Sequence, residues 1–459
     1  MTAEQITSEV LIVSELLALG VSHKTAPLDL RERLSLTEGR AVGALHELTA
    51  SEGIHEAAAI STCNRTELYL IVSDTVEAES TGLGVLTRQA EIRPTELLGH
   101  LYSLRSGEAA HHLFQVTAGL DSMIVGEAEI QGQVKRAYEL ALVEGATGPI
   151  LNRLFRGALA AGGRVREETA VGEKGVSIPS VALELARRTL GDLAERRVLV
   201  IGAGETAELV AKALVARGVA TVFVANRHYD RAIGLAQRFG GDAVRFEELP
   251  EQLAAADIVV SATNSPHHIV EREGLEHVME SRDGRPLLLV DIAVPRDIEP
   301  ECREIAGVSL HDIDDVQQIV ERNAGGREAE ARRAEPIIAA ELDRFERWLA
   351  SLAVVPTIAS LRERADEVAR RVLAENEERW EGMSEADRER LEAMARAIVS
   401  RLLHEPTVRM KRSAGSDDAY LYVSALRELF GLDAETEPEG EVGGKVTELR
   451  RVDPGRGSS

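Results

Sequence analysis

The order of apolar and polar residues predicts an α+β arrangement at the start of the chain. From about residue 10 to residue 72 the pattern predicts a strand, a helix over 34–52 and a second strand over 56–73. Residues 94–145 carry apolar side chains at a spacing near 3.6, which is typical of amphipathic helices. We therefore expect an α+β first domain over residues 1–149.

The pattern changes after a helical connector expected over residues 150–190. Residues 191–312 alternate short apolar runs with helical segments, which is typical of a parallel, doubly wound sheet. The predicted strands are RRVLVIGAG, ATVFVANR, DAVRF, DIVVSATN and PLLLVDIAV.

A third pattern begins after Asp312. Residues 313–355 are charged and rich in Ala, Glu and Arg, and they predict one extended helix that Pro356 ends. Residues 356–432 predict amphipathic helices that bury their apolar faces against each other, often across a dimer. These faces carry Leu361, Ala365, Val368, Val372, Leu391, Met394, Ile398 and Leu402. The acidic tail, 433–459, is expected to be disordered because it has little apolar content.

Composition places the chain among soluble, multidomain proteins. It has 459 residues, of which 44% are hydrophobic and 28% charged, so about three domains are expected. No apolar run approaches the roughly 20 residues that span a bilayer, so no membrane association is expected. The N-terminus lacks the features of a secretory signal. The expected location is the cytoplasm.

The formal net charge of -24 argues against a nucleic-acid partner, because phosphate binding relies on Lys and Arg. The basic residues, however, are almost all Arg, which can bind a phosphate with two hydrogen bonds. Acidic surfaces with few Lys also suit a salt-rich cytoplasm, where long-range repulsion is screened. We take adaptation to salt as a hypothesis.

A glycine-rich turn follows the first strand of the predicted parallel sheet. In VLVIGAGETAELVA, glycines would let backbone amides approach a pyrophosphate at a helix N-terminus. Arg227, at the end of the next strand, favours the 2′-phosphate of NADPH. The alternatives are a tight turn without a ligand and a solvated surface Arg. The predicted cofactor-binding residues are Gly202, Ala203, Gly204, Glu205, Thr206, Ala207, Asn226 and Arg227.

Cys63 is the candidate nucleophile. It lies in AAAISTCNRTE, where an apolar strand meets polar residues, and Arg65 is expected to lower the pKa of its thiol. An arbitrary cysteine is more often buried and structural, but the polar neighbours favour the functional interpretation. Cys302, in IEPECREIAG, keeps the structural one. Two cysteines make neither a disulfide framework nor a metal site.

A second polar group lies in the helical region of the first domain. His112 is on an apolar helix face, where a histidine is more often structural than catalytic. The segment GLDSMIVGEAEIQGQVK then gathers polar side chains that need partners or a ligand. These are Asp121, Ser122, Glu127, Glu129 and Gln133.

The chain closely resembles the glutamyl-tRNA reductase family in several segments that occur in order from about residue 20 to 430. They are GVSHKTAP (20–27), STCNRTE (61–67), HLFQVTAGLDSMIVGEAEIQGQVKRAY (112–138), GAGETAELVAK (202–212), VDIAVPRDIEP (290–300), DIDDVQQIVERN (312–323) and LLHEPTVRMK (402–411).

The resemblance implies a catalytic domain, a Rossmann-type NADPH domain and a long spinal helix leading to a helical dimerisation domain. It also implies a V-shaped homodimer. Cys63 matches the nucleophile, and His112 matches a histidine important for activity. The substrate-recognition residues fall on Thr62, Asn64, Arg65, Ser122, Glu127, Glu129 and Gln133.

The chain departs from the family pattern at three positions. Ala207 replaces a frequent third glycine of the nucleotide loop, and Ala is tolerated there. Glu129 stands where many members have Gln, and His228 where Thr is common. These departures concern the contacts with substrate and phosphate.

The implied reaction is the first step of tetrapyrrole biosynthesis by the five-carbon route. The Cys63 thiolate attacks the ester of glutamyl-tRNA(Glu), and hydride from NADPH reduces the resulting thioester to glutamate-1-semialdehyde. Arg65 would bind the substrate γ-carboxylate, and His112 would assist proton transfer. A glutamate-1-semialdehyde aminomutase would take the product.

Two other functions fit parts of the sequence. A small-molecule dehydrogenase of the shikimate type would use the nucleotide domain and need no nucleophilic cysteine. A nucleotide-sensing, tRNA-binding scaffold would use the long helix as a spacer and would not oxidise NADPH.

Overall fold

The computed structural model forms two compact units, Met1–Leu349 and Ala350–Ser459. The expected tail, 433–459, lies outside the described residues. The structure describes residues 14–123, 125–127, 129–171, 178–202, 204–216, 219, 221–226, 229–263, 265–322, 327–377, 382–414 and 419–432.

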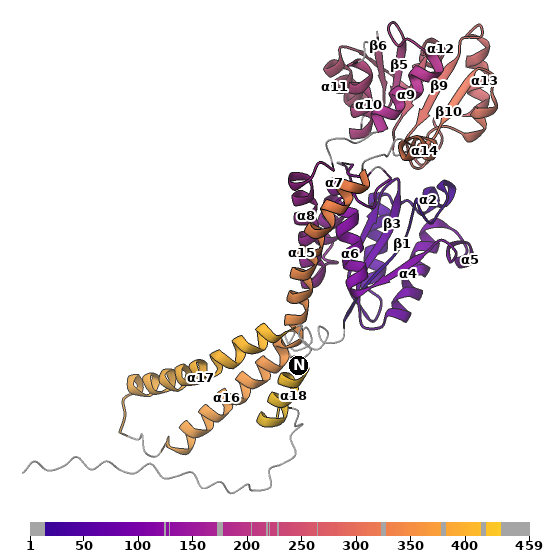
Figure 1. Cartoon of the computed structure of the whole chain (residues 1–459). Coiled ribbons are helices and arrows are strands. Elements are labelled where there is room, and N and C mark those ends of the chain that lie inside the picture. The colour runs from indigo at the N-terminus through magenta and orange to yellow at the C-terminus, as the bar shows by residue number, and fades with distance from the viewer. Residues whose placement is uncertain are drawn as a thin grey trace, which may run out of the picture. The chain divides into compact units, whose positions relative to one another are not determined.

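The first unit begins with a four-stranded antiparallel sheet in the order β2-β3-β1-β4. Figure 1 labels its two central strands, β3 and β1. Its strands are β1 (Glu15–Ser22), β2 (Ile54–Ser61), β3 (Arg65–Val72) and β4 (Tyr102–Arg105). The accompanying helices are α2 (Leu28–Leu34), α3 (Glu38–Thr49), α4 (Thr75–Ala90), α5 (Pro94–Leu97), α6 (Ser106–Thr117), α7 (Glu129–Val143) and α8 (Pro149–Glu168). All residues of β3 are buried, because helices cover both faces of the sheet.

Side chains of β3 alternate between the two covered faces, as the period of a strand requires. Leu68 faces α4, where Gly82 comes so close that an added Cβ would lie 3.7 Å from the Leu68 side chain. Tyr69 points the other way and makes an edge-on contact with Phe155 of α8, with 5.7 Å between ring centroids. Positions 65 and 67 share the face of Tyr69.

The predicted single strand over 56–73 is wrong, because the segment is a hairpin of β2 and β3. The Thr62 hydroxyl accepts hydrogen bonds from the backbone N–H groups of Asn64 and Arg65, at 3.1 and 3.2 Å. A side chain that accepts from the backbone two or three residues later stabilises a turn. Cys63 therefore lies in the turn of a hairpin.

The prediction of helix through residues 94–145 is wrong at β4. Tyr102–Arg105 pairs with the free edge of β1. Four residues are too short to show a strand period inside a longer helical pattern. Helices α6 and α7 lie within the predicted range.

The predicted parallel sheet is confirmed, with six strands in the order β10-β9-β8-β5-β6-β7. The strands are β5 (Arg197–Ile201), β6 (Thr221–Ala225), β7 (Asp242–Val244), β8 (Ile258–Ser261), β9 (Leu287–Asp291) and β10 (Val308–His311), the last of which was not predicted. The helices are α9 (Ile178–Leu190), α10 (Glu205–Val215), α11 (Tyr229–Phe239), α12 (Leu249–Ala255), α13 (Arg272–Glu280) and α14 (Ile313–Arg322), with short 3-10 turns at Phe246–Glu248 and Pro300–Glu304.

The strand order reverses between β5 and β8, which is where doubly wound sheets bind ligands. Gly202 follows β5 with a φ of 114°. A Cβ at this position would lie 2.4 Å from the Ala262 carbonyl oxygen, just after β8. Only glycine therefore fits at the point where the strand order reverses.

The remaining helices are α15 (Arg327–Ala353), α16 (Val355–Glu375), α17 (Glu385–Ser413) and α18 (Ala419–Phe430). The predicted break near Pro356 is confirmed, because Val354 separates α15 from α16. In the second unit, Ile358 and Met410 join a small apolar cluster. In this single chain, Met394, Ile398 and Leu402 of α17 are exposed. Within the described ranges, no helix combines the length and apolar character needed to cross a membrane.

Candidate active site

A buried ion pair forms the centre of the first domain. Arg65 and Glu67 lie on the same face of β3, and their side chains are 1% and 0% exposed. The distance from Arg65 Nη1 to Glu67 Oε1 is 2.6 Å. A buried pair of this kind is stable only when further hydrogen bonds satisfy both groups.

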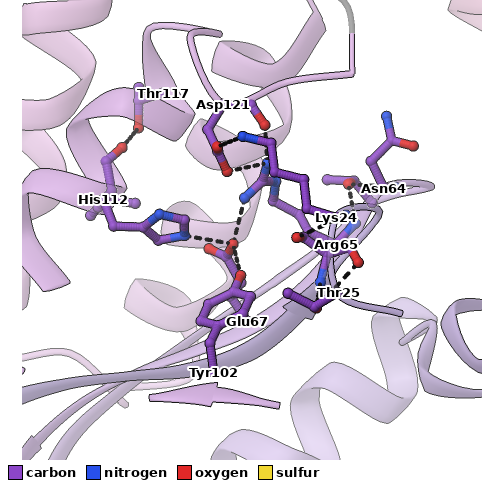
Figure 2. A network of polar contacts seen from close by, with 12 residues as sticks. Lys24, Thr25, Asn64, Arg65, Glu67, Tyr102, His112, Thr117 and Asp121 are labelled. Carbon is purple, nitrogen blue, oxygen red and sulfur yellow. Dashed lines mark hydrogen bonds and ion pairs between the residues drawn. The ribbon is translucent and has the colours of Figure 1, made fainter. Parts of the chain in front are cut away.

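Glu67 accepts hydrogen bonds from three more side chains, and Figure 2 shows those of Tyr102 and His112. Tyr69 donates to Oε2 at 2.7 Å, and His112 Nε2 lies 2.9 Å from Oε1. The Tyr102 hydroxyl also donates to Oε1. Burial alone would raise the pKa of Glu67, but the Arg65 charge and the His112 hydrogen bond hold it well below its usual range. Glu67 is therefore a carboxylate in the folded protein.

Gly20 makes this cluster possible. It is the β1 residue paired with Glu67 on one side and Tyr102 on the other. A Cβ at Gly20 would lie 2.8 Å from Glu67 Cγ and 2.6 Å from the Thr66 carbonyl oxygen. The missing side chain leaves the space through which Glu67 reaches Tyr102.

The second half of the Arg65 guanidinium binds Asp121, in the segment between α6 and α7. Nη2 lies 3.0 Å from Asp121 Oδ2 and also donates to the Asp121 carbonyl. Lys24 forms an ion pair with the same carboxylate. Burial would raise the pKa of Asp121, but Arg65 and Lys24 lower it. Arg65 therefore has both ends of its guanidinium occupied by protein groups.

His112 is partly exposed and is also bound to Glu67. It is therefore neither an unpartnered histidine nor a fully buried one. Its ring is partly accessible, with 14% of the side chain exposed, and one nitrogen is bound to Glu67. Tyr102 packs edge-on against it with 5.4 Å between ring centroids. A carboxylate on one ring nitrogen fixes the orientation of an imidazole.

Cys63 is partly exposed at the hairpin turn. Burial raises the pKa of its thiol to about 12, and the charges of Glu127 and Glu129 add to the rise. The expectation that Arg65 activates the thiol is therefore wrong, because Glu67 and Asp121 bind that guanidinium. The cation that opposes the rise is Arg31, whose Nη1 donates to the Cys63 carbonyl at 2.9 Å.

Glu127 is a titratable carboxyl whose charge acts on Cys63. Burial raises the pKa of Glu127 to about 7, the Ser122 hydroxyl opposes the rise, and Glu129 adds to it. Near neutral pH this carboxyl is present in both protonation states, as a proton-transfer group requires. Gln133 lies half-buried on α7, one turn after Glu129.

Three buried polar atoms of the residues named for this site have no hydrogen-bond partner among the described residues. They are Nδ1 of His23, Oδ1 of Asn64 and Oγ of Ser122. Burial and the nearby Arg65 charge lower the pKa of His23 to about 4, so its ring is neutral near pH 7. Unsatisfied buried polar atoms are uncommon and often mark a place for a ligand.

The nucleotide turn contacts the first domain through Thr206. Its hydroxyl donates to Glu129 Oε2 at 3.0 Å. Ala207 is fully buried beside the parallel sheet, where its small side chain fits the position of a third glycine. Gly204 precedes α10, and Asn226 follows β6. Ala203, Arg227, His228 and the side chain of Glu205 lie outside the described residues.

The sequence reasoning missed Glu67, Tyr102, Lys24 and Arg31. A signal for Glu67 was present, since Arg65 and Glu67 are charged residues at alternate positions of an apolar strand. Such residues share one face and must be paired if that face is buried. Tyr102 and Lys24 carry no such local signal, because only tertiary pairing brings them to Glu67 and Asp121. Cys302, by contrast, is fully buried in an apolar cluster, which confirms its structural role.

Three family models match successive parts of the chain. Residues 19–169 match the N-terminal domain of glutamyl-tRNAGlu reductase, and 333–432 match the dimerisation domain of the same family. Residues 184–319 match the shikimate/quinate 5-dehydrogenase model. The dehydrogenase likeness is therefore confined to the middle of the chain.

Curated relatives match over nearly the whole length. Glutamyl-tRNA reductase from Pelotomaculum thermopropionicum is 43% identical over 418 residues, covering 91% of this chain and 94% of the relative. The enzyme of the same name from Geobacter sulfurreducens is 41% identical, covering 93% and 99%. The solved structure of glutamyl-tRNA reductase from Methanopyrus kandleri is 36% identical, with a TM-score of 0.50, and covers 91% and 99%.

Proposed function

Since the chain belongs to the glutamyl-tRNA reductase family, we propose that it reduces the glutamyl ester of tRNA(Glu) to glutamate-1-semialdehyde through the Cys63 thiol, with NADPH as the reductant. The chain is an oxidoreductase with a dehydrogenase-type domain for a nicotinamide cofactor. The observation that carries the proposal is the place of Cys63, which is partly exposed at a turn, in a site with a carboxyl whose pKa is about 7 and with unpartnered polar atoms.

The first step is transfer of the glutamyl group to sulfur. The Cys63 thiol loses its proton, and the thiolate attacks the ester carbonyl carbon. The bond from this carbon to the ribose oxygen breaks, the oxygen takes a proton, and a thioester forms. Because the thiol pKa is about 12 in the free protein, a base must accept the proton as the substrate binds.

Glu127 fits the role of that base. Its pKa of about 7 lets it accept a proton near neutral pH and return it to the ribose oxygen. Transfer of the proton from Cys63 to Glu127 also removes the negative charge that opposes the thiolate. His112, oriented by Glu67, remains the second candidate for proton transfer.

The substrate-recognition residues are proposed on the same grounds. Thr62 shapes the turn that presents Cys63, and Asn64 offers an acceptor without a partner. Arg65 is buried and paired with Asp121, so the substrate γ-carboxylate can bind to it only if Asp121 is displaced. Ser122, Glu129 and Gln133 complete the proposed set.

The nucleotide turn fits a dinucleotide. Gly202 lies where the strand order reverses, and its missing side chain lets the backbone after β5 pack closely against Ala262. The turn that follows leads into the N-terminus of α10, where a pyrophosphate would bind. When bound, NADPH would supply the hydride that reduces the thioester carbonyl carbon and releases the thiol group. Its binding residues are proposed as Gly202, Ala203, Gly204, Glu205, Thr206, Ala207, Asn226 and Arg227.

The match to the dimerisation domain supports a homodimer. We propose that a glutamate-1-semialdehyde aminomutase takes the product, because a free amino aldehyde is reactive. A charged transfer RNA as substrate also fits a cytoplasmic location.

The testing experiment compares wild type, Cys63→Ser and Cys302→Ala. Aldehyde formation from charged tRNA(Glu) and NADPH is measured at several salt concentrations. We expect activity in wild type and Cys302→Ala, and at least a 10²-fold loss in Cys63→Ser, because a hydroxyl is a weak nucleophile near neutral pH. Equal activity in all three would remove Cys63 as the nucleophile. An inactive wild type would remove the proposed function itself.

A further inference from the structure

Arg31 is a buried arginine of α2 that binds both the Cys63 carbonyl and a carboxylate of the nucleotide domain. Its side chain is 3% exposed. Nη1 donates to the Cys63 carbonyl at 2.9 Å, and Nε donates to the Ala26 carbonyl at 3.3 Å. Nη2 forms an ion pair with Asp314, in the first turn of α14. One guanidinium thus joins the hairpin turn to α14.

A second ion pair runs between the same two parts in the opposite sense. Arg296 follows β9, and its guanidinium binds Glu32 of α2 through Nε at 2.9 Å and Nη2 at 2.8 Å. It also pairs with Asp29. Helix α2 therefore offers a cation to α14 and carboxylates to Arg296, a charge arrangement that specifies how the helix is docked.

We propose that Arg31 is a positioning residue for the Cys63 nucleophile, and that Asp314 connects it to the nucleotide domain. Its charge favours the thiolate, and its bond to the Cys63 carbonyl holds the hairpin turn. The Asp314 carboxylate neutralises part of that charge. The inference rests on the proposed role of Cys63, but it concerns the thiol itself and can be tested without substrate.

Three charged groups act on the Cys63 sulfur. Glu127 and Glu129, from the segment before α7 and from its first turn, raise the pKa of the thiol, and Arg31 lowers it. Removing the Arg31 charge should therefore lower the fraction of Cys63 present as thiolate. Removing the Asp314 charge should raise that fraction, because Arg31 keeps its bonds to the Ala26 and Cys63 carbonyls. The opposite signs distinguish an electrostatic role from loss of folding.

The experiment measures alkylation of Cys63 by iodoacetamide from pH 7 to 10, without tRNA or NADPH. Mass spectrometry of peptides separates Cys63 from the buried Cys302. The variants are Arg31→Gln, Arg31→Lys and Asp314→Asn. Arg33→Gln is the matched control, because Arg33 lies on the same helix, is 47% exposed and pairs with Glu96 instead. Circular dichroism verifies folding of each variant.

In wild type, the alkylation rate should rise about tenfold per pH unit, because the thiolate fraction does so below the thiol pKa. At pH 8.5 we expect Arg31→Gln to react at least about threefold more slowly and Asp314→Asn at least about threefold faster, each pKa unit corresponding to about tenfold. Arg31→Lys should recover part of the rate, and Arg33→Gln should match wild type.

Unchanged rates in folded Arg31→Gln and Asp314→Asn would overturn the proposal. Changes of the same sign in both would also overturn it, since they would show a docking role only. If Arg31→Gln fails to fold, Asp314→Asn decides alone: a faster rate supports the proposal, and an unchanged or slower rate contradicts it. A Cys63→Ser variant that still reduces the substrate would contradict the proposed role of Cys63 in the reaction and leave the measured effect of Arg31 on the thiol intact.

Discussion

At the scale of single residues, the site depends on one buried carboxylate. Glu67 accepts hydrogen bonds from Arg65, Tyr69, Tyr102 and His112. Charged groups in a low-dielectric interior are stable only when satisfied in this way. Glu67 binds both His112 and Arg65 and holds them in place. It is therefore a positioning residue for these two side chains.

The first residue-scale prediction concerns Glu67→Gln. The change keeps the size but leaves the Arg65 charge without its closest partner, so we expect unfolding in urea to show a loss of about 3–5 kcal/mol. Glu79→Gln is the control, because Glu79 forms a surface pair with Arg105, and a loss below about 1 kcal/mol is expected. Equal losses in the two variants would contradict the central role of Glu67.

The Glu67 carboxylate also makes the free energy of unfolding depend on pH, in a direction that follows from its lowered pKa. The pKa of Glu67 lies below the ordinary value of 4.5 in the folded protein. Its contribution to the free energy of unfolding is therefore present above about pH 4.5 and is lost as the pH falls further. We expect the stability of wild type to fall below pH 4.5 more steeply than that of Glu67→Gln, which has no group to titrate there. Parallel curves in urea unfolding at pH 3 to 7 would exclude this.

The sequence could predict some of the residues that belong to the candidate site, but it could not predict their charge states. Cys63 and Glu127 could be found, because their polar neighbours follow one another along the chain. The state of the thiol could not, since it depends on Glu127, Glu129 and Arg31, which the fold brings together from distant segments. Local sequence shows which groups exist, and tertiary packing sets their charges.

At the scale of elements, the decisive feature is the centre of the antiparallel sheet. β1 lies between β3 and β4, and Gly20 gives Glu67 a passage across β1 to Tyr102. The strand is apolar on both sides of Gly20, so its sequence resembles that of any buried strand. The hairpin of β2 and β3 was read as one strand for a similar reason, because three turn residues interrupt the apolar pattern too briefly.

The element-scale prediction compares two glycines. Gly20→Ala should destabilise the protein by about 1–3 kcal/mol, because its Cβ would meet backbone atoms of β3. Gly43→Ala, in the exposed interior of α3 with open space around it, should stabilise the helix by about 0.5–1 kcal/mol. Thermal unfolding of both variants measures the difference. A stable Gly20→Ala variant would refute the proposed passage.

At the scale of the whole molecule, each segment of the chain serves a separate task. The antiparallel sheet carries Cys63, the parallel sheet carries the nucleotide turn, and α17 presents apolar residues to solvent in the single chain. The alternation of strands and helices predicted the parallel sheet, because its period extends over many residues. The packing of α16 and α17 was harder to predict, because their apolar faces are exposed in the single chain and the sequence does not show which surface of a second copy covers them.

The whole-molecule prediction concerns the homodimer. Ile398 lies in the middle of the apolar stripe on α17 and is 61% exposed. Ile398→Glu should raise the dimer dissociation constant on the order of tenfold or more, because a charge would have to be buried. Val76→Glu is the control, since Val76 is 68% exposed on α4. Sedimentation should show the control as a dimer, and an equally dimeric Ile398→Glu would place the interface elsewhere.

The occupied guanidinium of Arg65 has a consequence for inhibitors and for specificity. Asp121 already supplies the carboxylate that Arg65 and Lys24 hold, so an incoming carboxylate replaces one acid with another of the same charge. Such an exchange leaves the electrostatic balance of the site nearly unchanged, and its free energy comes from shape and from the release of Asp121. A neutral amide in the same position would leave Arg65 paired with Glu67 alone and its Nη2 without a carboxylate, which is costly in a buried site. With the γ-carboxylate bound to Arg65 as proposed, we expect a substrate with a γ-amide to bind more weakly than glutamyl-tRNA, because Asp121 would be displaced without a carboxylate replacing it.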